Sequence, residues 1–200
     1  LPGIYSIRSY SMEEIVARDF ILNEKPDAIL NILDATNIER NLYLTLQLLA
    51  LRIPTVIALN MMDVLEKNGE KLDPKIIEKN LGVPVVCISA QKQENLDELM
   101  NRALEASNKP RKAYSVLNDS NLAHIIKDVE TAFKGLDVDS PLFHAVKLVE
   151  NDELEVKMHS QLTKVVDEFK KTYNDSVFGT DLEAVIADAR YKYITSKLSI

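Results

Sequence analysis

The stretch IALNMMD, residues 57–63, decides the fold of this chain. Its start continues an apolar run of β-branched and aliphatic residues, TVIALN, which is typical of a strand buried on both faces of a parallel sheet. The run stops at the amide of Asn60, and the carboxylate of Asp63 follows three residues later. Open parallel sheets bind their ligands beyond the carboxyl ends of the strands, so this stretch also indicates where a site would lie.

Two further runs, AILNILD (28–34) and VPVVCIS (83–89), predict two more strands of the same kind. Helical patterns lie between the strands, and the first begins with the capping-box pair Ser11 and Glu14. The other helices are expected over residues 38–51, from Asp73-Pro74 to Gly82, and over 95–108. This alternation predicts an α/β fold, a mostly parallel sheet with helical crossovers on both faces.

The pattern changes near residue 110, because no comparable strand run follows. The remainder predicts helices at about 118–134, 141–150, 153–173 and 181–198. We therefore expect two domains, an α/β domain over residues 1–109 and a small all-helical domain over 110–200.

The totals exclude several classes of protein. The 200 residues carry a net charge of −7, which argues against a nucleic-acid-binding protein. The single cysteine allows no disulfide within the chain, as expected for a reducing compartment. No apolar run approaches the roughly 20 residues that a membrane span needs, so this segment is expected to be soluble.

The strand ends offer what recognition of guanine requires. The carboxylate of Asp63 could accept two parallel hydrogen bonds from the guanine ring N1 and the exocyclic amine, which adenine cannot supply. The amide of Asn60 could bind N7 and brace neighbouring loops, and Ser89-Ala90, after the next strand, could present a backbone N–H to O6. Since Asn and Asp are common wherever a strand turns into a loop, the N-x-x-D spacing alone is weak, and the Ser-Ala pair strengthens it.

The chain start adds a third element. Leu1-Pro2-Gly3 is similar to the end of a D-x-P-G switch sequence, in which the glycine N–H meets the γ-phosphate of a nucleotide. A simple turn is the plainer interpretation of the same three residues. The 200 residues contain no G-x-x-x-x-G-K-[ST] phosphate loop, on which catalysis of phosphoryl transfer depends.

Other polar residues have plainer interpretations. His124, His144 and His159 lie far apart, without a partner at spacings such as H-x-x-x-H, so no metal site and no direct iron binding is expected. Asp34 at a strand end also fits, weakly, a phosphoacceptor receiver domain. Met61 and Met62 could fill the core instead of facing a ligand.

Three segments together resemble the cytosolic G-protein portion of the ferrous iron transporter B family. They are LPGIYSIRSYS (1–11), the run from 26 to 63 that contains DATNIERNLYLTLQL, and LGVPVVCISAQKQENLDEL (81–99). The later segments DSPLFHAVKLVEND (139–152) and AVIADARYKYI (184–194) resemble the helical, GDI-like domain that follows in that family. The resemblance covers nearly the whole chain and implies a P-loop GTPase-like fold.

The resemblance implies roles for single residues. Asn60 and Asp63 match the N-K-x-D element that binds guanine, and Met61 stands in place of its lysine. Ser89 and Ala90 match the S-A-K element, with Gln91 instead of lysine, and Gly3 matches the switch glycine. Ile4 stands where many small GTPases carry a water-orienting glutamine, so slow GTP hydrolysis is expected. No catalytic residue is assigned.

The implied protein binds GTP or GDP with Mg²⁺, whose ligands are expected mainly upstream of Leu1. It would regulate a membrane permease for Fe²⁺ from the cytoplasmic face of the membrane, and it could form homo-oligomers. A protein that truly began at Leu1 would be expected to fold poorly and to bind nucleotide weakly. The alternative function is a non-catalytic protein-interaction module, in which the α/β part is only a scaffold.

Overall fold

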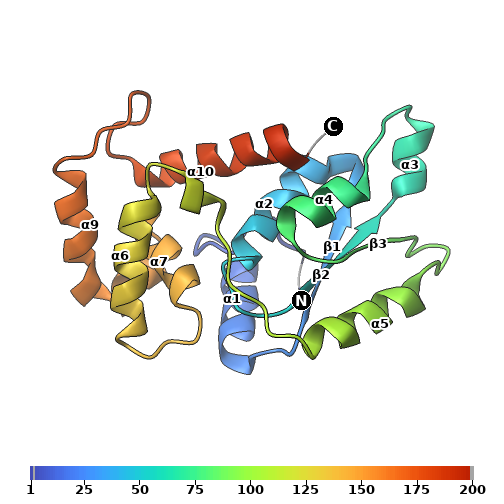
Figure 1. The fold of residues 1–200 in the computed structure, drawn as a ribbon, viewed down its shortest axis with the longest axis horizontal. Coiled ribbons are helices and arrows are strands. Elements are labelled where there is room, and N and C mark those ends of the chain that lie inside the picture. Colours follow the sequence, from blue (N-terminus) through green and yellow to red (C-terminus); the bar gives the residue numbers. More distant parts are fainter. Residues whose placement is uncertain (2, 199–200) are drawn as a thin grey trace.

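We describe the chain from a computed structural model, in which residues 1 and 3–198 are described. Figure 1 shows a small sheet with its helices on one side of the molecule and a group of helices on the other, bridged by α10 (Leu182–Tyr193). Pro2 of the predicted switch sequence lies outside the described residues.

The sheet is formed by the three predicted runs. The strands β1 (Ile29–Asp34), β2 (Thr55–Asn60) and β3 (Val85–Ile88) are parallel and lie in the order β1-β2-β3. Every residue of β2 from Thr55 to Leu59 is buried, as the continuous apolar run predicts.

The crossovers were expected on both faces of the sheet, but the structure places them on one face. The connections α2 (Ile38–Leu48), α3 (Met62–Lys67) and α4 (Pro74–Leu81) pack on one face, against residues such as Leu33 and Leu59. Since the strands follow one another in a single direction, right-handed crossovers must fall on the same side. The opposite face is covered at β2 and β3 by α5 (Leu96–Ser107), through Leu99.

The predicted caps are present. In α1 (Met12–Glu24), the Ser11 side chain accepts a hydrogen bond from the Glu14 backbone, and the Glu14 side chain accepts one from the Ser11 backbone. In α4, Asp73 caps the amino end, and Gly82 (φ 66°) ends the helix in the left-handed region where glycine is favoured.

Two predicted helices of the second half are wrong in extent. The helix expected from residue 118 begins later, as α6 (Ala123–Lys134), because the side chains of Ser115 and Ser120 accept backbone N–H groups and form turns. The helix expected over 153–173 is interrupted at His159, which leaves the helical conformation (φ −128°, ψ 43°). The elements there are α8 (Glu153–Met158), η3 (Ser160–Leu162) and α9 (Thr163–Lys170).

The remaining elements are α7 (Pro141–Val149) and four short turns of helix, η1 (Ala35–Asn37), η2 (Val116–Asp119), η3 and the π-helical η4 (Ile194–Leu198). Of the helices over residues 3–198, none combines the length and apolarity that a bilayer crossing requires.

The largest core joins both halves of the chain. It contains Leu44 and Leu48 of α2 together with Phe133 of α6 and Phe143 of α7. At the end of α10 the chain returns to the sheet side, where Ile194 packs with residues of α2 and α4. Residues on either side of position 110 therefore share one buried interior.

Candidate functional site

The ends of the three strands lie at one edge of the sheet. In the register of the strands, Asp34 lies opposite Asn60, and Asn60 lies opposite Ile88. Ser89-Ala90, which follows β3, therefore lies beside the end of β2. The sequence predicted this neighbourhood of Ser89-Ala90 and Asn60.

Asn60 joins two of these strand ends. Its side-chain Oδ1 accepts a hydrogen bond from the backbone N–H of Ala90 at 3.2 Å. The bracing contact expected of this amide is thus present, and it ties the β2–α3 loop to the β3–α5 loop.

Met61 adopts a backbone conformation that the sequence did not predict. It lies in the left-handed region (φ 67°, ψ 27°), which is uncommon for a residue other than glycine. The turn begins α3 and places Asp63 in its first helical turn. Met61 is 37% exposed and so does not fill the core, whereas Met62 packs against it.

Asp63 forms a weak surface ion pair. Its Oδ2 lies 3.5 Å from Nζ of Lys92, and the two side chains are 40% and 54% exposed. A pair this exposed contributes about 1 kcal/mol at most, so the carboxylate can exchange it for another partner at little cost. Lys92 was not predicted as a site residue.

The loop after β3 is held by its own hydrogen bonds. Ser89 and Glu94 exchange backbone hydrogen bonds at 3.3 and 3.0 Å, and Ser89 Oγ accepts the N–H of Lys92 at 3.3 Å. Asn95, in the left-handed region, donates its side-chain amide to the carbonyl of Cys87 at 2.8 Å. Asn95 was not predicted as a site residue, although its place just before a helix was the available signal. Gln91 lies exposed within this loop.

Asp34 has a local structural role. Its Oδ1 accepts hydrogen bonds from the backbone N–H of Thr36 at 2.8 Å and from Thr36 Oγ1 at 2.7 Å. The carboxylate therefore caps η1, which accounts for its position without a receiver-type phosphorylation site.

The segment after Gly3 lies along α2. The guanidinium of Arg40 lies 3.7 Å from the ring centroid of Tyr5, and Gln47 Nε2 donates to Ser6 Oγ at 2.9 Å. Gly3 itself is exposed, and a Cβ placed on it would contact nothing within 4 Å. Space therefore does not explain glycine at this position.

A buried ionic network links this segment to the helical half. Lys147 Nζ lies 2.9 Å from both Gln47 Oε1 and Glu150 Oε1, and Arg190 Nη1 lies 2.7 Å from Glu150 Oε2. Burial alone would raise the pKa of Glu150, but the two cations outweigh it and lower that pKa to about 2. Since Gln47 Oε1 also accepts the backbone N–H of Ile7 at 3.3 Å, one chain of contacts connects the amino-terminal segment, α2, α7 and α10.

None of the three largest cavities described below is lined by Asn60, Asp63, Ser89 or Ala90. A groove of about 620 Å³ lies at the opposite edge of the sheet, where Thr55 and Pro84 precede or begin the strands. Two others, of about 670 and 270 Å³, border the strand ends through Met62 and Thr36 respectively. Because ligands of parallel sheets bind at the carboxyl edge, the groove at the opposite edge lies on the wrong side of the sheet for the strand-end site.

A parallel sheet with polar residues at its carboxyl edge, followed by helices, is the arrangement expected of a G domain with an appended helical domain, and the similarity to known proteins identifies it as one. The family model "Ferrous iron transport protein B" matches residues 1–103, and the model "FeoB cytosolic helical domain" matches residues 119–199. The chain belongs to the ferrous iron transport protein B family.

Individual relatives agree with this assignment. The Fe(2+) transport protein A/Fe(2+) transporter FeoB fusion protein of Porphyromonas gingivalis is 32% identical over 99% of this chain and 25% of its own length. The Fe(2+) transporter FeoB of Legionella pneumophila is 32% identical over 97% of this chain and 26% of its own length. The chain thus spans about a quarter of the length of these relatives.

A solved structure extends the similarity to the whole fold. The crystal structure of NFeoB from S. thermophilus bound to GDP, AlF4⁻ and K⁺ matches with a TM-score of 0.86 and 36% identity. The match covers 99% of this chain and 79% of that one.

Proposed function

We propose that the strand-end residues bind guanine nucleotide, and that this chain is the GTP-binding, slowly hydrolysing regulatory portion of a ferrous iron transporter. The observation that carries the proposal is the hydrogen bond from Ala90 N to Asn60 Oδ1, which joins the loops that hold the base-reading groups. The structural relative bound to GDP and AlF4⁻ supports a guanine nucleotide as the ligand.

Each residue has a role in this proposal. Asp63 accepts the hydrogen bonds of guanine N1 and the exocyclic amine, and the exposed thioether of Met61 covers the base. Asn60 meets N7, while Ser89, Ala90 and Gln91 form the loop at O6. The backbone N–H of Gly3 meets the γ-phosphate. Mg²⁺ would be held mainly by residues upstream of Leu1.

Slow hydrolysis follows from the residue after the switch glycine. Ile4 is aliphatic and packs against the main core, so its side chain cannot orient a water molecule by hydrogen bonding. Any group that positions the attacking water would come from outside this stretch.

The helical part transmits the state of the nucleotide. We assign residues 1–109 to the G domain and 110–200 to the helical domain. The network of Gln47, Lys147 and Glu150 contacts the segment from Ser6 to Ile7, which would order and disorder with the γ-phosphate. The partner would be a membrane permease domain of the same protein, reached from the cytoplasmic face, and homo-oligomers are compatible with this arrangement.

Exchange of Asp63 for asparagine tests the assignment. Asp63→Asn replaces one acceptor oxygen with a donor, so GDP should bind roughly 10- to 100-fold more weakly, as loss of charged hydrogen bonds implies. Xanthosine diphosphate, which carries an acceptor where guanine carries its amine, should gain affinity. The measurement is competition against a fluorescent GDP analogue, in the longest soluble segment of the natural protein that contains this chain.

Glu66→Gln, an exposed acid-to-amide change one turn further along α3, is the matched control and should leave both affinities unchanged. An Asp63→Asn variant that keeps its preference for GDP over xanthosine diphosphate would refute the assignment. An interaction module without nucleotide binding would show no competition in any variant.

A further inference from the structure

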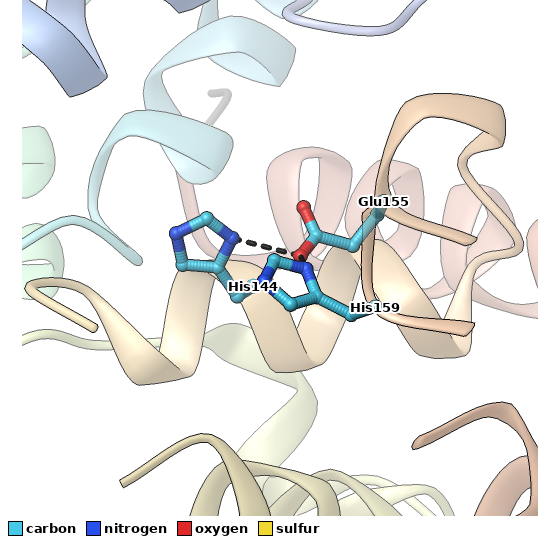
Figure 2. Close-up of side chains that lie close together, drawn as sticks. All are labelled: His144, Glu155 and His159. Atoms are coloured by element: carbon cyan, nitrogen blue, oxygen red, sulfur yellow. Dashed lines mark hydrogen bonds and ion pairs between the residues drawn. The ribbon is translucent and has the colours of Figure 1, made fainter. Parts of the chain in front are cut away.

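Two histidines and a glutamate converge in the helical half, away from the strand-end residues. Figure 2 shows the rings of His144 and His159 beside the carboxylate of Glu155. Nδ1 of His144 lies 2.8 Å from Glu155 Oε1, and Nδ1 of His159 lies 2.6 Å from the same oxygen. One ligand atom from each residue falls within 4.8 Å of the others.

The fold brings these residues together although their spacing in the sequence did not predict it. His144 comes from the middle of α7, and Glu155 from α8. His159 follows α8 directly, and the departure from helical conformation there ends the helix beside Glu155, four residues back. The E-x-x-x-H spacing of Glu155 and His159 was the one sequence signal, although no metal site was expected at these histidines.

The contact to His159 is close without being a hydrogen bond. Its Nδ1 is buried and, among the described residues, has no partner in hydrogen-bonding geometry, despite the 2.6 Å separation from Oε1. A buried polar atom left in this way normally has an explanation, and a bound ion is one of them.

The glutamate is held from behind. Arg18 Nη2 lies 2.6 Å from the other oxygen of Glu155, and Arg18 Nη1 lies 2.7 Å from Asp152. These side chains are at most 3% exposed. Carboxylates that bind metals are commonly fixed by such outer hydrogen bonds, which leave one oxygen directed at the ion.

The histidine rings are held by aromatic neighbours. Phe133 packs edge-on against His159, with ring centroids 4.8 Å apart, and lies 5.5 Å from His144. Phe143 contacts His144 from another side at 5.6 Å. Packing that fixes ring orientation preorganises a site, because little conformational freedom remains to be lost on binding.

We propose that His144, Glu155 and His159 form a binding site for one divalent transition-metal ion. Two imidazoles and one carboxylate are the ligand set that suits zinc and ferrous iron, whereas calcium and magnesium prefer all-oxygen sites. With metal–ligand distances of about 2.0–2.2 Å, the ligand atoms would lie roughly 3.3 Å apart. The nitrogen of His144 therefore needs to move away from Oε1 by about 0.5 Å, and that of His159 by about 0.7 Å. Water would complete the coordination. The site does not depend on the proposed nucleotide function.

Metal titration of the metal-free chain tests the proposal. We expect the dialysed protein to bind one Zn²⁺ or, without oxygen, one Fe²⁺ per chain, and to bind neither Mg²⁺ nor Ca²⁺ here. His144→Asn and His159→Asn each remove a direct ligand, so each should weaken binding by at least the roughly 10- to 100-fold that loss of an outer-shell partner costs. The measurement is isothermal titration calorimetry near neutral pH.

His124→Asn is the matched control. His124 is 85% exposed and pairs with Asp128 one turn along α6, so this variant should bind metal as the unaltered chain does. Circular dichroism of the three variants shows whether each is folded. Should a buried variant unfold, Co²⁺ bound to the unaltered chain must still give the intense visible absorption of a low-symmetry site with nitrogen ligands.

No saturable binding by the unaltered chain, or equal affinity in the folded His144→Asn, His159→Asn and His124→Asn variants, would overturn the proposal. The cluster would then be a set of buried polar contacts within the core and not a metal site. A Co²⁺ complex with the spectrum of the hydrated ion would overturn it as well.

Discussion

A few buried, paired charges hold the helical half to the rest of the molecule. Glu150 is contacted by both Lys147 and Arg190, and the three side chains are 7%, 1% and 4% exposed. Charges this deep are tolerated only when they are paired, because each has lost its hydration. Lys147 also reaches Gln47 of α2, so the same group of charges fixes the contact between α7 and the α/β part.

Glu150→Gln is expected to destabilise the chain by about 3–5 kcal/mol, because two buried cations lose their shared counter-charge. Chemical denaturation followed by circular dichroism measures the change in the free energy of unfolding. Glu168→Gln breaks an ion pair with Lys171 whose side chains are 70% and 66% exposed, and should change stability by less than about 0.5 kcal/mol. Equal effects of the two variants would contradict the role given to Glu150.

The sequence predicted the bracing role of the Asn60 side chain. It did not predict the backbone conformation of Met61 or the ion pair of Asp63. Asn60 could be proposed as a brace because an amide at a strand end is close to the next strand's exit. The left-handed conformation of Met61 was not predictable, since methionine has no preference for it and only the turn into α3 imposes it. The Lys92–Asp63 pair was missed because a flexible surface lysine carries no sequence signal.

At the scale of elements, local chemistry predicted the strands and the ends of α4, but not the start of α6. The three strands and the ends of α4 followed from apolar runs, a proline and a glycine. The prediction of one helix over residues 153–173 was wrong because this stretch contains no glycine or proline to mark a break. At the interruption, His159 packs against Phe133 of α6, which is distant in the sequence, and contacts Glu155 one turn back. Periodicity alone cannot detect a break of that kind.

The capping box of α1 gives a prediction at this scale. Ser11→Ala removes the acceptor of the Glu14 N–H and should lower the free energy of unfolding by about 1 kcal/mol. Ser176→Ala, at an exposed serine in a loop, is the control and should have almost no effect. Denaturant titration compares the two, and a smaller loss in Ser11→Ala than in the control would show that the box adds no stability.

At the scale of the whole molecule, the chain order alone did not give the spatial arrangement. Alternating strands and helices predicted a parallel sheet, yet both crossovers share one face because the strands follow in simple order. The core common to α2, α6 and α7 was also not predictable, since it depends on contacts between segments about ninety residues apart. Ile7 of the amino-terminal segment belongs to the same core, so this segment is packed directly against the helical part.

The most direct test of nucleotide recognition is displacement of a fluorescent GDP analogue by GDP and by ADP. The displacement assay uses the longest soluble segment of the natural protein that contains this chain. If Asn60 and Asp63 hold a guanine base, GDP displaces the analogue and ADP does not, because adenine lacks the donor pair that Asp63 requires. Equal displacement by GDP and ADP, or no binding of the analogue, would contradict the assignment.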